Sequence, residues 1–496
     1  MGDKTSVVIV GAGTCGLAAA CELRRMGVSV RLLEARPGPN AGSRATLLWP
    51  LGLAVLRSLG ALAEAERRGL RLNALQYHMD GDKRLRTRVG AENEALVLAQ
   101  DQTSLILERI LEELGGRVER STRVVDVAST GEGITVKAQQ PDSTELIEAD
   151  WLIAADGVGS TVRQALGIDF PGVALPTTYL ATEGRILGDL EPGDVHYFLR
   201  ASGSMVVAPL RGGKVRLGAP IPEGTELTEA TVQRLLRERG STGMRVESLD
   251  EITTFSSQER IAAALRKGRC FLVGDAAHTH SPIGGQGLNL GLQDVHNLAW
   301  KLAGVVRGVF HPAILDSYEP ERRQAAQQTV QNTGRFAKMF MLSPAKARMR
   351  NTAWRGLEAT GLLRRRFVPL LAGWRVSYPD ALFATTGPVT APRGMPSPGT
   401  RVPPWVPAPS QPGQGTFRLL TLGDRDGDLR RRAQDLAGTM PGLVSHDHHS
   451  ERGRGFLLLR PDGFVARSGT TPDDLDRAGH LLAGLTPTGR DGREEH

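Results

Sequence analysis

The pattern of apolar and polar positions divides the chain into segments with the periodicity of strands and of helices. A β-branched run at residues 6–10 and a second apolar run at 28–33 flank a glycine-rich turn and a helical stretch at 17–26. Two further apolar runs, at 151–155 and 270–273, are followed by Asp-Gly and by Gly-Asp. Continuous apolar runs are typical of strands covered on both faces. The pattern therefore predicts an α/β fold with a parallel sheet.

The longest predicted helix follows a glycine-rich loop at residues 282–287. Its apolar residues recur at three- and four-residue steps, at Leu288, Leu292, Val295, Ala299, Leu302 and Val306. The loop has almost no side chains, and it opens onto a helix N-terminus, where unpaired N–H groups and the positive end of the helix dipole are available. This stretch predicts a site for a large, flat and partly anionic ligand.

Residues 176–259 change to short alternating segments. Two of them, at 205–210 and 214–221, flank Arg211-Gly212-Gly213, which is a hairpin signal. We expect an antiparallel sheet that forms one wall of a substrate cavity. Tyr197, Phe198 and Met205 lie in this region. Each of these side chains can line the cavity or pack in the core, and the sequence leaves both possibilities open.

The last part of the chain is divided by proline. Helical segments are expected to continue to about residue 384, and residues 388–412 are too rich in proline for a packed element. A hairpin follows, in which Pro461-Asp462-Gly463 forms a type I turn between two strands. His446, Asp447, His448 and His449 form a small cluster that we interpret as a polar loop, with a metal site as the alternative.

Length and composition limit the kinds of protein that are compatible with this pattern. A chain of 496 residues is expected to form two or three domains. Its net charge is +7, but only 8 of its 61 basic residues are lysines, so arginine-rich composition explains the charge better than nucleic-acid binding does. The three cysteines show no pairing pattern, which favours a reduced, cytoplasmic setting. We expect no signal peptide and no membrane span.

The N-terminal glycines form a dinucleotide-binding fingerprint in its usual context of strand, helix and second strand. Gly11, Gly13 and Gly16 provide the tight turn, the approach of the pyrophosphate and the packing of helix on strand. Glu34 lies 18 residues after Gly16, at the end of the second strand, where it can accept hydrogen bonds from ribose hydroxyls. The fingerprint alone does not distinguish FAD from NAD(P).

Further motifs resemble those of the single-component FAD-dependent aromatic hydroxylases, the family of p-hydroxybenzoate hydroxylase. The first is Gly-Asp-Ala-Ala-His with the Pro and Gly-Gln-Gly-x-Asn that follow it, over residues 274–289. The second is Asp-Gly-x-x-Ser-x-Val-Arg over 156–163, and a Tyr-x-x-Glu-Arg-Arg run over 318–323 follows later. The resemblance covers about residues 5–385. The tail is similar to the C-terminal domain of the bacterial aromatic polyketide hydroxylases.

The resemblance implies a domain organisation. Residues 1–175 and 260–385 would form a Rossmann-like FAD-binding domain of the glutathione-reductase type with its following helices. An antiparallel β-sheet substrate domain would be inserted at 176–259. A proline-rich linker at 386–414 would lead to a degenerate thioredoxin-like domain at 415–496. All three cysteines lie outside this last domain, so disulfide chemistry is excluded there and packing or dimerisation is the expected role.

The resemblance also implies a set of cofactor contacts. The ADP half of FAD would be held by Gly11, Gly13, Gly16 and Glu34, and its middle by Arg44, Gln100 and Asp275. Asp156 would serve both FAD and NAD(P)H, and backbone donors to the isoalloxazine would come from Gly285, Gly287, Leu288 and Asn289. Arg44 and Pro282 would lie nearest the flavin ring, but no catalytic residue is assigned, and His278 and His280 are interpreted as turn residues behind the flavin.

Three of these residues have an alternative interpretation, in which the side chain only supports the fold and does not contact FAD. Arg44 can be a loop arginine, Gln100 a polar helix cap and Asp156 the start of a turn. Ser104 stands where many members of the family carry an acid, so the chain departs from the family at that position.

The expected chemistry follows from the family and from the single nucleotide fingerprint. FAD would be bound tightly, and NADPH or NADH would bind transiently, because no second fingerprint is present. Reaction of reduced flavin with O2 would give a C4a-hydroperoxide that attacks an electron-rich ring, as in hydroxylation of a polyketide-type aromatic. Epoxidation, Baeyer–Villiger oxidation and antibiotic inactivation stay open, as does a non-catalytic flavin-binding accessory protein. We expect no metal, no nucleic acid, and a monomer or homodimer.

Overall fold

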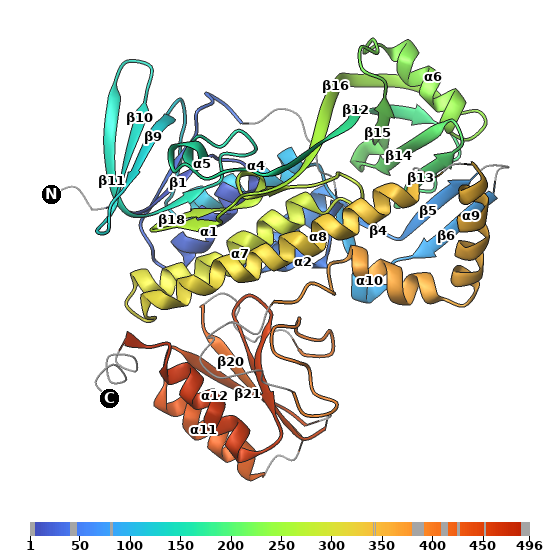
Figure 1. The fold of residues 1–496 in the computed structure, drawn as a ribbon. Helices are drawn as coiled ribbons and strands as arrows, with labels where there is room; N and C mark the ends of the chain where they lie inside the picture. The colour runs from blue at the N-terminus through green and yellow to red at the C-terminus, as the bar shows by residue number, and fades with distance from the viewer. Residues whose placement is uncertain are drawn as a thin grey trace.

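The computed structural model describes residues 5–39, 47–79, 83–340, 342, 344–378, 391–407, 415–423, 427–450 and 453–487. Arg44, with the rest of the segment 40–46, lies outside the described residues. The described chain is an α/β structure with two large mixed sheets and a smaller sheet near the C-terminus. Figure 1 shows α7 (Gly287–Val306) and α8 (Tyr318–Phe340) side by side through the middle of the molecule, with the C-terminal layer below them.

The first large sheet contains the four strands that the apolar runs predict. Its strand order is β17-β18-β11-β1-β2-β8, and the pairs from β18 to β8 are parallel. An antiparallel extension, β9 and β10, continues from β11. The bounds are β1 (Thr5–Val10), β2 (Val30–Leu33), β8 (Val118–Glu119), β9 (Arg123–Ser129), β10 (Ile134–Gln139), β11 (Thr144–Ala154), β17 (Arg266–Lys267) and β18 (Cys270–Leu272).

Helices cover this sheet and connect it to a short third sheet. The almost wholly buried α1 packs against α4 and α7, and it begins three residues earlier than the apolar pattern predicts. The helices are α1 (Thr14–Arg25), α2 (Pro50–Ser58), α3 (Leu62–Arg68), α4 (Gln100–Glu113) and α5 (Thr161–Ala165). The short sheet consists of β3 (Leu47–Leu48), β7 (Ala95–Val97) and β4 (Leu70–Leu72), in that order.

The second large sheet has the order β19-β16-β12-β15-β14-β13-β5-β6. Its strands are β5 (Ala74–Met79), β6 (Lys83–Arg88), β12 (Gly172–Leu187), β13 (Asp194–Arg200), β14 (Gly203–Pro209), β15 (Val215–Ile221), β16 (Arg245–Ile261) and β19 (His278–Thr279). The hairpin at residues 211–213 joins β14 and β15 as predicted. The sheet is mixed rather than antiparallel, because β5 comes from an earlier part of the chain and pairs in parallel with β13.

The two faces of the second sheet have different surroundings. One face packs against α6 (Glu229–Arg239) through a core that includes Leu180, Phe198, Leu217 and Leu236. The other face contributes to a separate apolar cluster that also includes side chains from α8, α9 (Pro344–Ala359) and α10 (Val368–Leu371). Because side chains alternate along a strand, Phe198 lies on the α6 side and its neighbour Tyr197 on the opposite side.

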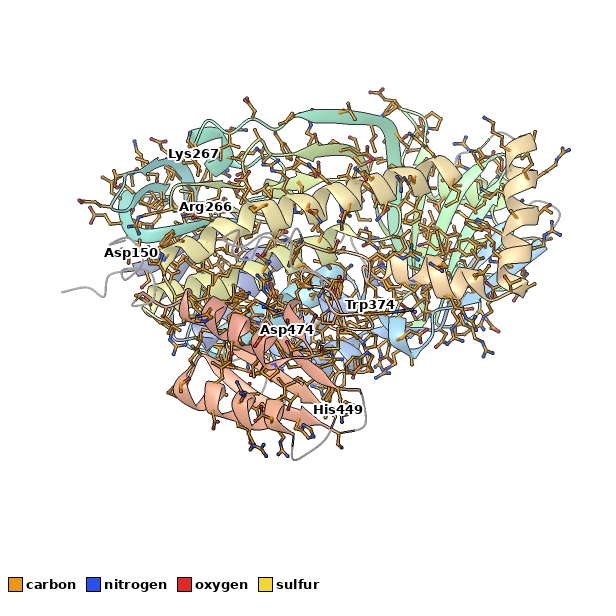
Figure 2. The ribbon with its side chains drawn as sticks, turned by 60° about the horizontal axis from the view of Figure 1, so that its bottom comes forward. Asp150, Arg266, Lys267, Trp374, His449 and Asp474 are labelled. Carbon is orange, nitrogen blue, oxygen red and sulfur yellow. The ribbon has the colours of Figure 1, made fainter. Side chains whose placement is uncertain are left out.

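The helices after α7 run as far as α10 before the C-terminal sheet, and the predicted end near residue 384 lies outside the described residues. Gly373 follows α10 with a φ of +77°. Trp374 then donates its indole N–H to the carbonyl of Glu92 at 3.1 Å, and Figure 2 shows it where these helices meet the N-terminal part of the chain. This hydrogen bond connects the segment after α10 to the segment between β6 and β7.

The C-terminal sheet has the order β21-β20-β22-β23. Its elements are β20 (Phe417–Leu422), α11 (Asp428–Thr439), β21 (Val444–His449), β22 (Gly455–Leu459), β23 (Val465–Gly469) and α12 (Pro472–Ala483). The predicted hairpin around residues 461–463 joins β22 and β23. The histidine cluster lies on β21, which is a strand and not the loop that the sequence indicated, and His446 and His448 both bond the hydroxyl of Thr421.

A buried histidine pair makes the stability of the second sheet depend on pH. His78 and His196 are 1% and 2% exposed, and their Nε2 and Nδ1 atoms are 3.0 Å apart. Burial, with the charges of His196, Arg84 and Arg200, lowers the pKa of His78 from 6.5 to about 3. The folded pKa is below the unfolded one, so the stabilisation is present above pH 6.5 and is lost as the pH falls toward 3.

We therefore expect a His78→Gln variant to depend less on pH than the native protein. Between pH 7.5 and 5 the free energy of unfolding should fall by on the order of 1 kcal/mol less in the variant, after allowance for solvent screening. Urea unfolding at both pH values measures this difference. Equal pH dependence in the two proteins would contradict a neutral, buried His78.

Candidate active site

The glycine loop between β1 and α1 contains two glycines that the fold requires and one that it does not. Gly11 has a φ of +97°, and a Cβ there would lie 2.5 Å from the carbonyl oxygen of Ala155. A Cβ on Gly16 would lie 1.8 Å from the carbonyl oxygen of Gly11. Gly13 has an ordinary extended backbone (φ −71°), and no described atom lies within 4 Å of a Cβ built on it. The space in front of Gly13 is therefore open to a ligand.

The start of α1 also fits an anionic ligand. Gly13 is its N-cap and makes no side-chain cap hydrogen bond, and the first turn carries no acidic residue. Unpaired N–H groups and the helix dipole favour a phosphate at such a terminus. Glu34 lies beside the loop, where its two carboxylate oxygens accept from the backbone N–H of Ala12 at 2.8 Å and of Arg36 at 3.0 Å. A carboxylate has further acceptor capacity for ribose hydroxyls.

The first turn of α4 lies next to the first turn of α1. Gln100 begins α4, and its Nε2 is 3.5 Å from the hydroxyl of Thr14, the first residue of α1. The hydroxyls of Thr14 and Ser104 are 2.9 Å apart. Ser104, the position that departs from the family, thus joins α4 to α1. This arrangement places Gln100 at the N-terminus of α1, beside the glycine loop.

The turn that follows β11 contacts the Gly-Asp turn, which begins at Gly274. Asp156 accepts from the backbone N–H of Val162 at 3.1 Å, which is the turn-forming role that the sequence left open. Burial raises the pKa of Asp156, and its other oxygen has no partner among the described residues. Arg163 donates to the carbonyls of Val158 at 2.7 Å and Ala276 at 2.9 Å. The two turns are therefore held together.

The Gly-Asp turn is supported from behind by a buried carboxylate that sequence reasoning missed. Asp294 accepts from the backbone N–H of Gly274 at 2.9 Å, from His278 at 2.7 Å and from Arg322 at 2.7 Å. Burial opposes ionisation of Asp294, but the charges of His278 and Arg322 outweigh it and lower its pKa. Asp275 itself is exposed between buried neighbours. The turn thus presents the Asp275 carboxylate away from the core.

The 282–287 loop and the start of α7 carry the remaining predicted cofactor residues. Leu288 and Asn289 are 7% and 3% exposed, in the first turn of α7. The amide of Asn289 binds the loop itself, by donating to the carbonyls of Gly285 at 2.8 Å and Leu47 at 2.9 Å. α7 has no side-chain cap and no acidic residue in its first turn. Its N-terminus therefore keeps the donor character that a flavin ring would use.

Three consecutive polar side chains before the loop lack partners among the described residues. They are the hydroxyls of Thr279 and Ser281 and the Nε2 of His280. Burial lowers the pKa of His280 to about 4, so its ring is neutral, and its Nδ1 pairs with the carbonyl of Ser281 at 2.8 Å. Unsatisfied buried polar atoms are uncommon in native proteins. Their place beside the loop fits a polar group that completes this region.

A cavity of about 160 Å³ lies between the 282–287 loop and the second sheet. Pro282 and Gly285 line it on one side, and Tyr179, Tyr197 and Phe255 are among the side chains that line it on the other. Tyr179 and Phe255 stack with ring centroids 5.4 Å apart. Met205 is among the residues at the cavity, but it belongs with Phe198 to the core on the α6 side. The cavity suits a flat apolar molecule next to the loop.

The fold and the site together define a flavoprotein that binds FAD. A family model described as "FAD binding domain" matches residues 4–333, and the chain belongs to that family. Within it, the chain is an FAD-dependent monooxygenase of the aromatic hydroxylase class. The predicted FAD cofactor is confirmed. The described residues fit it, because Gly13 faces open space and two uncapped helix N-termini are available.

Several similar proteins are named as monooxygenases or hydroxylases. The chain is 31% identical to 6-methylpretetramide 4-monooxygenase of Streptomyces rimosus, over 95% of this chain and 92% of the relative. It is 33% identical to pentachlorophenol 4-monooxygenase of Sphingobium chlorophenolicum, over 68% and 65%. Among solved structures, anhydrotetracycline hydroxylase from Streptomyces rimosus is similar, with a TM-score of 0.77 and 29% identity, over 97% of this chain and 98% of that one.

No helix in the described part of the chain is long and apolar enough to cross a membrane. Within the same residues, no group of three or more His, Cys, Asp or Glu side chains has the arrangement of a metal site.

Proposed function

We propose that this protein hydroxylates a polycyclic, polyketide-type aromatic with NAD(P)H and O2. The observation that carries the proposal is the apolar cavity of about 160 Å³ between the 282–287 loop and the second sheet. A flat aromatic substrate there would face a flavin ring held at the loop. Full-length similarity to a pretetramide monooxygenase supports a multi-ring substrate.

In this proposal FAD would supply the oxygen chemistry, with NAD(P)H as its reductant. The chain binds and orients the cofactor. Its ADP half would lie at the glycine loop and Glu34, and its middle at Gln100, Asp156, Asp275 and Arg44. The flavin ring would lie against Pro282 and the backbone of residues 285–289, where the N-terminus of α7 favours negative charge on the reduced ring.

The cavity has one charged side chain among its described lining residues, Arg216 on β15. Its side chain is 12% exposed and pairs with Glu183 on β12 at 2.8 Å, which fixes it at the cavity wall. Burying an arginine is costly, and its placement facing an apolar cavity favours contact with an oxygen of the substrate. We expect Arg216→Gln to raise KM for a phenolic substrate about 10- to 100-fold, as loss of a charged hydrogen bond of 1.5–3 kcal/mol would do.

The matched control for Arg216→Gln is Arg84→Gln, which removes an exposed arginine paired with Asp189 on another part of the sheet. Steady-state kinetics of both variants with the same phenol separate the roles. An unchanged KM in Arg216→Gln would show that this side chain supports the sheet and does not bind substrate.

The domain organisation is part of the proposal. The first large sheet would belong to an FAD-binding part (residues 1–175 and 260–385). The second would belong mainly to a substrate part (176–259), with β5, β6 and β19 added from outside that range. A thioredoxin-like origin of residues 415–496 is supported by the strand order β21-β20-β22-β23, with β20 parallel to β21 and antiparallel to β22. We propose a packing or dimerisation role for this part.

The deciding experiment is oxidation of NADPH and of NADH in air by the FAD-loaded protein, with and without a hydroxyanthraquinone. Strong stimulation by the aromatic supports a substrate-gated monooxygenase, and mass spectrometry of the product then distinguishes hydroxylation from epoxidation and from Baeyer–Villiger insertion. Absence of any NAD(P)H oxidation with FAD bound would overturn the proposal in favour of a flavin-binding accessory protein.

A further inference from the structure

Two side chains fasten the 282–287 loop to the segment before α2. Trp49 donates its indole N–H to the carbonyl of Gly284 at 2.9 Å. Asn289 accepts from the backbone N–H of Trp49 at 2.8 Å, and its amide nitrogen donates to the carbonyls of Leu47 and Gly285. Trp49 is 1% exposed and is among the largest fully buried side chains of the described chain. Both side chains are therefore committed to internal contacts.

The surroundings leave little room for this connection to shift. A Cβ on Gly52 would lie 2.5 Å from the amide oxygen of Asn289, so a side chain there would collide with it. A Cβ on Gly285 would lie 3.0 Å from that of Leu47. Gln286 holds the loop from the other side by donating to the carbonyls of Gly284 and Leu371. Close packing of this kind transmits a displacement instead of absorbing it.

The connection joins two neighbouring parts of the cavity wall. Leu47 lines the cavity, and so do Pro282, Ile283, Gly284 and Gly285. The bond from Trp49 to Gly284 and the two bonds from Asn289 therefore hold the loop in place beside Leu47, facing the second sheet. The same loop leads into the helix N-terminus at which we place the flavin ring.

We propose that Trp49 is a positioning residue that holds the 282–287 loop against the segment before α2, at a fixed place in the cavity wall, and so couples NAD(P)H oxidation to oxygen transfer. The inference rests on the proposed function for its kinetic consequence. It adds a role for a residue outside the glycine motifs, one that acts through the loop and touches neither substrate nor cofactor directly.

The two competing outcomes differ in their products. In the coupled reaction, NAD(P)H, O2, a proton and the aromatic C–H compound give NAD(P)⁺, water and the hydroxylated aromatic. In the uncoupled reaction, NAD(P)H, O2 and a proton give NAD(P)⁺ and hydrogen peroxide. A displacement of about 1 Å in a positioning element is enough to lower the rate of a chemical step about 100-fold. A loosened loop therefore shifts the balance toward hydrogen peroxide while NAD(P)H is still consumed.

The test compares Trp49→Phe with Trp300→Phe. Both variants replace a buried indole by a phenyl ring, but the indole N–H of Trp300 has no partner among the described residues. Trp300 is 3% exposed and packs edge-on against Phe310 and Phe417, away from the cavity-lining residues. The pair therefore isolates the bond to Gly284 from the general effect of a smaller aromatic ring.

The first measurement is hydrogen–deuterium exchange of the FAD-loaded proteins. We expect Trp49→Phe to increase exchange about tenfold in a peptide that covers residues 283–290, with the peptides of β1 and β11 unchanged, and Trp300→Phe to leave that peptide unchanged. Equal exchange at residues 283–290 in all three proteins would overturn the proposal. A uniform increase throughout the molecule would do so too, because it would show a general loss of stability.

The second measurement is the ratio of hydrogen peroxide to NAD(P)H consumed with a hydroxyanthraquinone present. We expect the ratio to rise at least twofold in Trp49→Phe and to stay at the native value in Trp300→Phe. A native ratio in Trp49→Phe together with a mobile loop would overturn the coupling role. If the native protein consumes no NAD(P)H, the proposed function fails, whereas the exchange measurement still decides whether Trp49 holds the loop.

Discussion

Replacing Gly13 by valine is expected to leave the protein folded and to abolish FAD binding. The backbone of Gly13 is extended (φ −71°, ψ 178°), which any residue adopts, and no described atom lies within 4 Å of a Cβ built there. A glycine at this position is therefore not required by the protein. It is required if the pyrophosphate of FAD approaches the backbone at the start of α1. We expect the affinity for FAD to fall at least 100-fold, with stability of the apoprotein within about 0.5 kcal/mol of native.

The control is Gly16→Ala, which adds a smaller side chain only three residues away. A Cβ at Gly16 would lie 1.8 Å from the carbonyl oxygen of Gly11, so this variant should lose stability whether or not FAD is present. Fluorescence titration of the apoproteins with FAD, and urea unfolding of the same samples, separate the two effects. Full FAD affinity in a folded Gly13→Val protein would remove the pyrophosphate from this loop.

The three glycines illustrate how much of the site can be predicted from the sequence. The fingerprint predicted Gly11, Gly13 and Gly16 as one set, and the strands and helix around them follow from local apolar runs. The structure divides the set, because only the positions of Ala155 and Gly11 itself show which glycines the fold requires. Local pattern thus predicted the elements of the FAD-binding sheet, the loop before α7 and three roles for the glycines, but not which backbone atoms a side chain at Gly11 or Gly16 would meet.

Other parts of the site depend on contacts between distant residues, which no local pattern reveals. Asp294 reads as one polar residue of α7, yet it accepts from Gly274, His278 and Arg322 behind the Gly-Asp turn. The Tyr-x-x-Glu-Arg-Arg run over 318–323 resembles a family motif, but it does not show that Arg322 binds Asp294. In the same way β5 pairs with β13, which lies more than a hundred residues later, and no local pattern indicates that pairing.

The second large effect is expected for Glu321→Gln, in a buried ionic cluster between α7, α8 and the C-terminal hairpin. Glu321 accepts from Lys301 at 2.7 Å and from Arg460 at 2.7 and 2.9 Å, and Arg460 also pairs with Asp462 at 2.6 Å. The side chains of all four residues are at most 1% exposed. Loss of the Glu321 charge leaves two buried cations with one anion, which should lower the free energy of unfolding by about 3–5 kcal/mol.

The pKa of Glu321 gives this prediction a second measurement. Burial would raise that pKa, but the charges of Arg460 and Lys301 outweigh it and lower it to about 2. The folded pKa is thus below the ordinary value of 4.5. The stabilisation is present in full above pH 4.5 and is lost as the pH falls through 2. The Glu321→Gln protein should lack this part of the acid dependence.

A double variant separates charge imbalance from the loss of one hydrogen-bonding group. Lys301→Met with Glu321→Gln removes one charge of each sign and leaves Arg460 paired with Asp462, so the cluster is balanced again. We expect the double variant to be more stable than the sum of the two single effects by about 1–3 kcal/mol, measured by urea unfolding at pH 7. Additive effects would show that the residues act independently. The C-terminal hairpin would then be held against α7 and α8 by its apolar contacts, such as the cluster of Phe464 with Leu290, Ala325 and Ala326.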